Sequence, residues 1–490
     1  MTMLLDLSSV FAGQQFSSIT ADSRQVKKGS VFLAYPGVSS DGRAYISQAI
    51  AAGAAAVLWE HAGFTWRTEW DVPNVAMHDL KHQAGHLAAD YYHQPSKALT
   101  MIGVTGTNGK TSVSQWLAQC LNYLGQKSAV LGTIGNGILD DGLSVAANTT
   151  PDAVLLQAML ADFLQKGVKA VAMEVSSHGL DQNRVSAVEF DVAVLTNLSR
   201  DHLDYHQTME AYAAAKQKLF ACVDLKVAVL NADDAFGQEI ALVATAQGKA
   251  VLTYGFAQGN VCGSNLQLHQ QGLCMDVTTP QGDALLIAPV LGRFNAYNVL
   301  AVLTTLLALN VSLQDALAAI AKLNPVQGRM QQFGGEDLPL VVVDYAHTPD
   351  ALEKVLSTLR EQLQDSQKLV CVFGCGGDRD TGKRPLMGNV ANQLADIVIV
   401  TSDNPRNEDP AAIIHEITRS MKAGYKIEPD REKAIQSAVN AANPADIVLV
   451  AGKGHENYQE VLGVKIPFSD AQVAQTALNN YMFNKAGATS

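Results

Sequence analysis

The sequence predicts an α/β protein of three domains, with a mostly parallel sheet in the central domain and a Rossmann-like, doubly wound C-terminal domain. Short apolar segments with strand character alternate with amphipathic helical segments, which is typical of parallel sheets with crossover helices. The length of 490 residues suggests about three domains at roughly 150 residues each. Turn-rich segments near residues 95 and 330 divide the alternation into three parts.

In the first part, strands are predicted at residues 31–35 and 55–59, and a helix at residues 45–52. Pro95 interrupts this pattern before the next strand. We therefore place the first domain at residues 1–98.

The second part, residues 99–328, repeats the alternation. Its predicted strands lie at residues 100–104, 170–175, 191–196 and 227–230, and its predicted helices at 111–124, 153–165 and 296–309. The polar, turn-rich segment 255–282 is expected to form an antiparallel hairpin at the sheet edge.

The third part, residues 329–490, contains a further alternating series. Strands are expected at residues 340–344, 369–373, 397–401 and 447–451, and helices at 349–362, 411–421 and 432–442. This series predicts a separate doubly wound domain.

The composition excludes several classes of protein. With 35 basic against 47 acidic residues, the net charge is −12, so no nucleic-acid partner is expected. The six cysteines are scattered without CxxC spacing, which argues against a zinc site. The first six residues lack the basic region of a signal peptide, and no apolar stretch reaches the ~18 residues of a membrane span. We expect a cytoplasmic protein.

The strongest motif is Gly-Val-Thr-Gly-Thr-Asn-Gly-Lys-Thr-Ser, between a predicted strand and a predicted helix. Gly106 and Gly109 allow the backbone to curl so that its N–H groups face phosphate oxygens. Lys110 can bind the β- and γ-phosphates, and the Thr111 hydroxyl suits Mg²⁺. The residue five before Gly109 is valine, where the general P-loop motif has glycine. The motif predicts that the central domain is a P-loop-type ATPase domain.

Two polar residues follow other strands of the same domain. Glu174 ends one predicted strand and offers a hard oxygen ligand for Mg²⁺. His202 lies in a dense polar segment after the next strand, which favours a functional role over a surface role. Lys216 lies on a predicted helix, and the sequence by itself gives it no role.

Polar residues also follow four strands of the third domain. They include Asp344, His347, Arg379, Arg406 and Glu456. The glycine-rich turn before Arg379 does not complete a G-x-G-x-x-G pattern, so it is weak support for dinucleotide binding. Guanidinium groups can grip a carboxylate while a glutamate binds an ammonium group. The cluster therefore suits an amino acid as ligand.

Taken together, the motifs resemble the Mur ligase family of peptidoglycan synthesis. They are, in order, Gly-Thr-Asn-Gly-Lys-Thr, Glu-Val-Ser-Ser-His-Gly-Leu, Asn-Leu-Ser-Arg-Asp-His-Leu-Asp-Tyr-His, Asp-Tyr-Ala-His-Thr-Pro, Asp-Asn-Pro-Arg and Gly-Lys-Gly-His-Glu. The resemblance implies that the first domain holds the uridine diphosphate end of the substrate, the central domain ATP, and the third domain the incoming amino acid. It also implies addition of meso-2,6-diaminopimelate to the D-glutamate of UDP-N-acetylmuramoyl-L-alanyl-D-glutamate through an acyl phosphate.

The resemblance assigns roles to individual residues. The implied catalytic residues are Lys110, Glu174, His202 and Lys216. The implied Mg²⁺ ligands are Thr111, Glu174, His202 and, as a carbamylated lysine, Lys216. The implied ATP contacts are Gly106, Thr107, Asn108, Gly109, Lys110, Thr111, Asn295, Asn298, Arg329, Asp344 and His347. The implied contacts to the UDP substrate are Ser23, Asn148, Thr149, Thr150, Ser176, Gln182 and Arg184. The implied diaminopimelate contacts are Arg379, Asp403, Asn404, Pro405, Arg406, Gly452 and Glu456.

The choice of amino acid is predicted to depend on Arg406. In the family, Asp-Asn-Pro-Arg accompanies diaminopimelate, which is lysine with a second carboxylate at its far end. Bound lysine would leave Arg406 without a partner, at a cost of ~1–3 kcal/mol.

Two other functions stay open on the sequence. One is a related ligase, either similar to folylpolyglutamate synthetase or a Mur ligase that adds another residue. The other is a nucleotide-binding regulator without catalysis. We expect a monomer.

Overall fold

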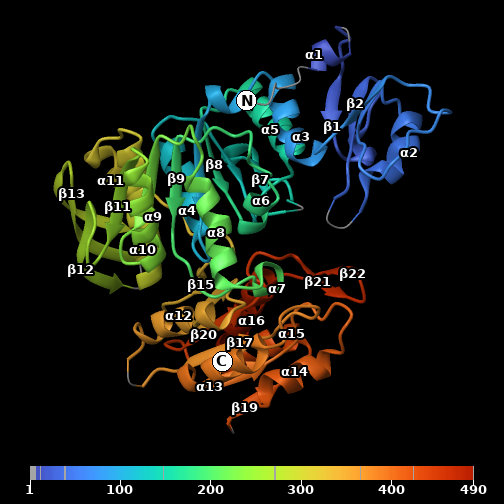
Figure 1. Cartoon of the computed structure of the whole chain (residues 1–490). Coiled ribbons are helices and arrows are strands. Elements are labelled where there is room, and N and C mark those ends of the chain that lie inside the picture. Colours follow the sequence, from blue (N-terminus) through green and yellow to red (C-terminus); the bar gives the residue numbers. More distant parts are fainter. Residues whose placement is uncertain are drawn as a thin grey trace.

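The computed structural model describes residues 7–11, 13–37, 40–146, 148–269, 272–364, 366–422 and 424–488. The expected α/β class is confirmed: three bodies, each with its own largely parallel sheet, follow one another along the chain (Figure 1). Residues 1–6, from which we expect no signal peptide, lie outside the described residues. No described helix is long and apolar enough to cross a membrane.

The N-terminal body is built on a four-stranded parallel sheet in the order β1-β2-β3-β4. Its strands are β1 (Ser18–Thr20), β2 (Ser30–Ala34), β3 (Ala56–Glu60) and β4 (Asn74–Met77), and its helices α1 (Leu7–Val10), α2 (Ile46–Ala51) and α3 (Leu80–Tyr91). β2 and β3 are buried along their whole length because hydrophobic clusters cover both sheet faces.

The central body contains a ten-stranded sheet in the order β14-β13-β12-β11-β10-β9-β5-β8-β6-β7. Its strands are β5 (Thr100–Thr105), β6 (Ser128–Leu131), β7 (Asn136–Ile138), β8 (Ala170–Glu174), β9 (Val192–Leu195), β10 (Val227–Asn231), β11 (Ala250–Gly255), β12 (Val261–His269), β13 (Gly272–Thr279) and β14 (Gly282–Ala288). Its helices are α4 (Lys110–Tyr123), α5 (Ala153–Gln165), α6 (Ser177–Asp181), α7 (Leu203–His206), α8 (Met209–Phe220), α9 (Ala235–Ala246), α10 (Arg293–Ala308) and α11 (Leu313–Ile320). The expected antiparallel hairpin is confirmed, since β12 and β13 pair antiparallel, but β14 pairs with the far side of β13 and forms the edge of the sheet.

Strand β8 shows why the middle of this sheet has continuous apolar strands. Ala170 and Ala172 belong to the hydrophobic core formed with α4 and α10. Val171 and Met173 belong to the core on the opposite face, which includes residues of α5. Both faces of the sheet are therefore shielded from solvent here, as expected for a parallel sheet covered by helices.

The C-terminal body has a six-stranded sheet in the order β15-β16-β20-β17-β18-β19, in which only β15 is antiparallel to its neighbour. Its strands are β15 (Gln331–Gly334), β16 (Leu340–Asp344), β17 (Leu369–Phe373), β18 (Ile397–Val400), β19 (Tyr425–Ile427) and β20 (Ile447–Ala451), followed by a separate hairpin, β21 (Tyr458–Val461) and β22 (Val464–Pro467). Its helices are α12 (Pro349–Arg360), α13 (Lys383–Leu394), α14 (Pro410–Thr418), α15 (Arg431–Ala441) and α16 (Asp470–Ala488).

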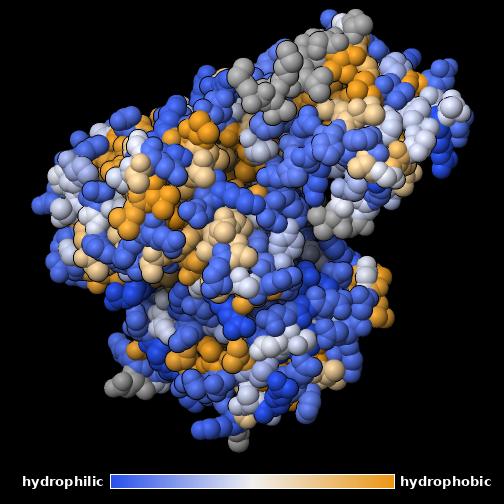
Figure 2. Space-filling model, viewed as in Figure 1, coloured by the Kyte–Doolittle hydropathy of each residue, from blue (hydrophilic) through white to orange (hydrophobic). Residues whose placement is uncertain are grey.

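The strand register brings the predicted polar residues together at the carboxyl ends of the strands, in both the central and the C-terminal sheet. In the central sheet Val104 pairs with Glu174, and Thr105 with Leu195, so the segments that follow these strands begin at one edge. In the C-terminal sheet Ala451 pairs with both Asp344 and Phe373. On the face shown in Figure 2, the residues along the boundary between the central and C-terminal bodies are mostly hydrophilic.

Candidate active site

The phosphate loop lies between the buried strand β5 and the N-terminus of α4. Gly106 and Gly109 have φ angles of +145° and +88°, which side chains rarely adopt. A Cβ atom at Gly106 would collide with Thr196 Oγ1, and one at Gly109 with Asn298 Oδ1. Both glycines are therefore required by conformation and by space, as the motif predicts.

Two lysines converge on one carbonyl oxygen of this loop. Lys110 Nζ donates to Gly106 O at 2.8 Å and to Thr107 O at 2.9 Å, and Lys216 Nζ donates to the same Gly106 O at 2.9 Å. Burial lowers the pKa of Lys110, and it lowers the pKa of Lys216 well below its usual value, with the Lys110 charge adding to the effect. Only 1% of Lys216 is exposed, and its Nζ lies 4.4 Å from the centre of the Tyr212 ring. The neutral amine form of Lys216 is therefore accessible.

A hydroxyl–carboxylate pair lies next to the loop at the end of β8. Thr111 Oγ1 donates to Glu174 Oε2 at 3.1 Å. Thr133 donates to the same carboxylate through its N–H at 2.8 Å and through its hydroxyl at 3.1 Å. Thr133 was not expected at this site, although it follows β6. Ligands bind outside the carboxyl ends of the strands of parallel sheets, and this strand-end rule, which applies to Glu174, applies to Thr133 as well.

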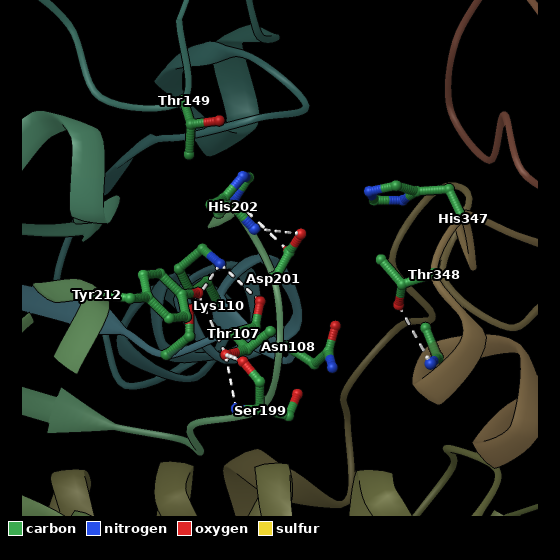
Figure 3. Close-up of polar contacts among 12 residues, drawn as sticks. Thr107, Asn108, Lys110, Thr149, Ser199, Asp201, His202, Tyr212, His347 and Thr348 are labelled. Carbon is green, nitrogen blue, oxygen red and sulfur yellow. Dashed lines mark hydrogen bonds and ion pairs between the residues drawn. The ribbon is translucent and has the colours of Figure 1, made fainter. Parts of the chain in front are cut away.

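His202 lies near Lys110, with its imidazole next to Asp201 (Figure 3). Its Nε2 is 3.5 Å from Asp201 Oδ2, and burial lowers the pKa of His202 to about 4. The ring is therefore neutral at pH 7 and retains a lone pair. His347 of the C-terminal body faces this pair from across the site (Figure 3).

The four expected magnesium ligands fit this ion if Lys216 is carbamylated. Thr111 and Glu174 offer hard oxygen atoms, and neutral His202 can donate a nitrogen lone pair. Lys216 fits as a ligand only as a carbamate, because an unmodified amine is a poor match for this ion. Its depressed pKa favours that modification, since the neutral amine is the form that reacts with CO₂.

Another carboxylate–imidazole group lies in the N-terminal body. Among the described residues, only Glu60, His61 and His78 bring three such ligand atoms within 4.8 Å of one another. Both oxygens of Glu60 accept backbone N–H groups, those of Ala62 at 3.3 Å and Leu80 at 2.8 Å. These bonds give Glu60 a structural role at the start of α3.

The residues expected to contact ATP are drawn from two bodies. Asn298 Nδ2 donates to Asn295 Oδ1 at 2.9 Å in the first turns of α10, beside Gly109. Arg329 Nη2 donates to Thr111 Oγ1 at 3.2 Å. A second connection, which the sequence did not indicate, joins Asn108 Nδ2 to Asp350 Oδ2 at 3.1 Å. The C-terminal body therefore contacts the phosphate loop directly.

Asp344 is the last residue of β16 and His347 lies in the segment that follows it, as the strand-end rule predicts. Asp344 accepts the N–H groups of Met330 and Ala346, both at 2.8 Å, and burial raises its pKa. His347 Nδ1 lies 2.8 Å from the carbonyl oxygen of Tyr345, and burial lowers the pKa of His347 to about 4.

Four of the expected UDP-substrate residues form one network. Thr150 Oγ1 donates to Ser176 Oγ at 3.1 Å, and Arg184 donates to Thr150 O at 2.7 Å and to Gln182 Oε1 at 2.7 Å. Thr150 Oγ1 also donates to Glu174 O at 2.8 Å, which connects this network to Glu174, and the hydroxyls of Thr149 and Thr133 are 3.1 Å apart. The two remaining residues are placed differently: Ser23 donates to Gln48 in the N-terminal body, and Asn148 is exposed.

The expected diaminopimelate residues also lie together. A Cβ atom placed on Gly376 would be 2.9 Å from Arg406 Nη1 and 3.8 Å from Arg379 Cγ, so both arginines border this glycine. Arg406 Nη1 donates to Gly377 O at 2.7 Å. Asn404 Nδ2 donates to Glu456 Oε2 at 2.8 Å. Their neighbours Asp403, Pro405 and Gly452 are buried, and a Cβ atom on Gly452 would be 2.6 Å from Asp403 Oδ2.

Three family models match the chain in succession. The one described as "Mur ligase family, catalytic domain" matches residues 15–92, "Mur ligase middle domain" residues 104–306, and "Mur ligase, glutamate ligase domain" residues 328–454. The chain belongs to the Mur ligase family.

Several relatives at about 50% identity share one name. The UDP-N-acetylmuramoyl-L-alanyl-D-glutamate–2,6-diaminopimelate ligase of Chromobacterium violaceum is 53% identical over 468 residues, which cover 95% of each chain. The protein of that name from Pseudomonas aeruginosa is 50% identical over 465 residues, 94% of each chain.

Solved structures agree with this placement. A structure of a UDP-N-acetylmuramoyl-L-alanyl-D-glutamate–2,6-diaminopimelate ligase is 37% identical, with a TM-score of 0.69 over 98% of this chain and 100% of that chain. Folylpolyglutamate synthase of Mycobacterium tuberculosis, 19% identical, has a TM-score of 0.63 over 76% of this chain and 92% of its own. At that identity the likeness concerns the fold alone.

Proposed function

We propose that this chain is an ATP-dependent ligase that joins meso-2,6-diaminopimelate to the D-glutamate carboxyl group of UDP-N-acetylmuramoyl-L-alanyl-D-glutamate, a step of peptidoglycan precursor synthesis. The observation that carries the proposal is the 53% identity, over 95% of both chains, with a protein named for that reaction. The geometry of the two sheet edges supplies the groups that such a reaction needs.

The reaction must first activate a carboxylate, which is a poor electrophile. Transfer of the ATP γ-phosphoryl group to it gives an acyl phosphate and ADP. The amine of diaminopimelate then attacks the acyl carbon, and phosphate leaves as the amide bond forms. In the first step two anions approach each other, so the site must supply positive charge.

Lys110 provides this charge from the phosphate loop. In the structure its ammonium group donates to the carbonyl oxygens of Gly106 and Thr107. We propose that it exchanges these bonds for the phosphate oxygens of ATP, while Asn295 and Asn298 line the adjacent start of α10 and Arg329 contacts the nucleotide from the C-terminal body.

Groups of the phosphate loop and of the segments near it suit a magnesium site. We propose that Thr111, Glu174, His202 and carbamylated Lys216 hold Mg²⁺. The ion would offset the repulsion between the transferring phosphoryl group and the substrate carboxylate. The carbamate would also convert a second buried cation beside Lys110 into an anion, which removes the repulsion between the two lysines.

The amino acid is proposed to bind at the edge of the C-terminal sheet. Arg379 and Arg406 border Gly376 and can receive the distal carboxylate of diaminopimelate. Glu456, beside Asn404, can receive an ammonium group. The UDP substrate would contact the network of Thr150, Ser176, Gln182 and Arg184 given above, with Ser23, Asn148 and Thr149 as further contacts.

The direct test is coupled ADP release with the UDP-dipeptide, ATP and a panel of amino acids. We expect turnover with meso-diaminopimelate and little with lysine or glutamate. A folylpolyglutamate synthetase would instead require a folate acceptor and glutamate. A regulator without catalysis would bind ATP and release no ADP. Either result would refute the proposal.

The proposal includes where the protein is located and whether it is a monomer. All six cysteines are free, which fits the reducing cytoplasm. We propose a cytoplasmic monomer of 52.2 kDa, and light scattering of the purified chain measures this mass directly.

A further inference from the structure

Lys453 is a completely buried cation in the cluster that we assign to diaminopimelate. Its side chain is 0% exposed. Its Nζ donates to Asn404 Oδ1 and to Glu456 Oε2, both at 2.9 Å, and lies 3.8 Å from Asp403 Oδ1. A lysine is rarely buried unless it is paired, and here its partners are three of the residues proposed to contact the substrate.

The bonds of Lys453 fix the orientation of Asn404. An ammonium group only donates and a carboxylate only accepts, so the amide oxygen must face Lys453 and the amide nitrogen must face Glu456. The N–H of Glu460 also donates to Asn404 Oδ1, at 2.9 Å. The carboxamide therefore has one possible orientation.

The same bonds leave one oxygen of Glu456 available. Oε2 accepts from both Lys453 and Asn404, whereas Oε1 has no hydrogen-bond partner among the described residues. The side chain of Glu456 is 17% exposed, compared with 0% for Lys453. Glu456 can therefore present Oε1 to a ligand while Oε2 stays attached to the protein.

We propose that Lys453 is a positioning residue for the amino-acid substrate: its ammonium group compensates Glu456 and Asp403 and holds Glu456 so that Oε1 receives an ammonium group of diaminopimelate. This inference rests on the proposed function. Without Lys453, two neighbouring carboxylates would repel each other, and Glu456 would lose its fixed orientation. The substrate would then bind to a disordered acceptor.

The test compares Lys453→Met, Glu456→Gln and the double variant in the ADP-release assay. We expect Lys453→Met to raise the KM for diaminopimelate about 30-fold or more, with the KM for ATP and for the UDP-dipeptide changed less than about twofold. Lys453→Arg, which retains the charge, should recover part of the loss. Lys465→Met is the matched control, because Lys465 is exposed and contacts the ring of the same Tyr458 that lies near Lys453.

The double variant separates positioning from structure. If Lys453 acts through Glu456, adding Lys453→Met to Glu456→Gln should change the KM for diaminopimelate less than about threefold. The double variant is compared with Glu456→Gln and not with Lys453→Met, so the comparison is available even if Lys453→Met alone does not fold; in the double variant only Asp403 of the two carboxylates remains. Additive losses, equal rises in KM for all three substrates, or an unchanged KM in Lys453→Met would overturn the inference. A wild-type chain that forms no amide would instead refute the proposed function.

Discussion

Replacement of Arg406 by alanine is expected to remove the preference for diaminopimelate over lysine. The Arg406 side chain is 20% exposed, with Nε 3.5 Å from Glu460 Oε2 and Nη1 donating to Gly377 O at 2.7 Å. Its Nη2 has no hydrogen-bond partner among the described residues and is available for a substrate carboxylate. From the sequence, we expected Arg406 to have no partner when lysine is bound. The structure shows instead that part of its guanidinium group is already paired.

The size of the effect follows from this geometry. A hydrogen bond to a charged group contributes about 1.5–3 kcal/mol, and the lower part of that range applies because Arg406 is partly paired and partly exposed. A loss of about 2 kcal/mol lowers kcat/KM for diaminopimelate about 30-fold. The backbone of Arg406 is anchored separately, since its N–H donates to Glu460 O at 3.0 Å and its carbonyl accepts from Leu462 N at 2.7 Å. The loop should therefore keep its course in the variant.

The assay is ADP release at saturating ATP and UDP-dipeptide, with diaminopimelate and lysine titrated separately. In Arg406→Ala, kcat/KM for lysine should change less than about threefold, because lysine has no distal carboxylate to lose a contact. Arg419→Ala serves as control, because Arg419 is an exposed arginine directly after α14. Equal use of both amino acids by the wild type, or equal losses for both in Arg406→Ala, would show that Arg406 does not set the choice.

Three further outcomes are expected. Lys216→Ala should lower kcat about 100-fold or more, with partial recovery in short-chain carboxylic acids that replace the carbamate; full activity of the untreated variant would remove Lys216 from the mechanism. Gly109→Ala should raise the KM for ATP at least about 10-fold, measured by ATP titration, because its Cβ would meet Asn298 at a φ of +88°; an unchanged KM would contradict the loop geometry. The pKa of His347 is lowered by burial to about 4, so unfolding takes up a proton and stability falls as pH decreases from about 6.5 to 4. His347→Gln should reduce that slope by up to about 1.4 kcal/mol per pH unit in urea unfolding, and an identical slope would refute the assignment.

Much of the fold could be predicted because its strands are buried on both faces. The predicted strands at residues 369–373 and 447–451 coincide with β17 and β20, whose residues are all buried. Helix α13, Lys383–Leu394, was not predicted, and its sequence explains why. It contains a proline, a glycine and two asparagines among only a few apolar residues, so local propensity gives no clear helical signal.

Site residues could be predicted from the sequence where they belong to motifs that directly follow a strand. Glu174, Asp344 and the phosphate loop all follow buried parallel strands, which is where the strand-end rule places ligands. Asp350 lies in the first turn of α12 and contacts the phosphate loop only because the C-terminal body folds against the central one. No local pattern encodes that contact. Lys453 belongs to a recognised motif, yet its role depends on partners up to 50 positions away that only the fold brings within reach.

The hydrogen bond between Arg329 and Thr111 joins the C-terminal body to the proposed nucleotide site. Thr111 Oγ1 accepts from Arg329 at 3.2 Å and donates to Glu174 at 3.1 Å. If this oxygen becomes a metal ligand, its remaining lone-pair capacity is reduced, and the cationic Arg329 is repelled by the ion. Arg329 is then free to contact the nucleotide from its own body. We therefore expect Arg329 to exchange Thr111 for the nucleotide when ATP binds, while the hydrogen bond between Asn108 and Asp350 continues to join the C-terminal body to the loop.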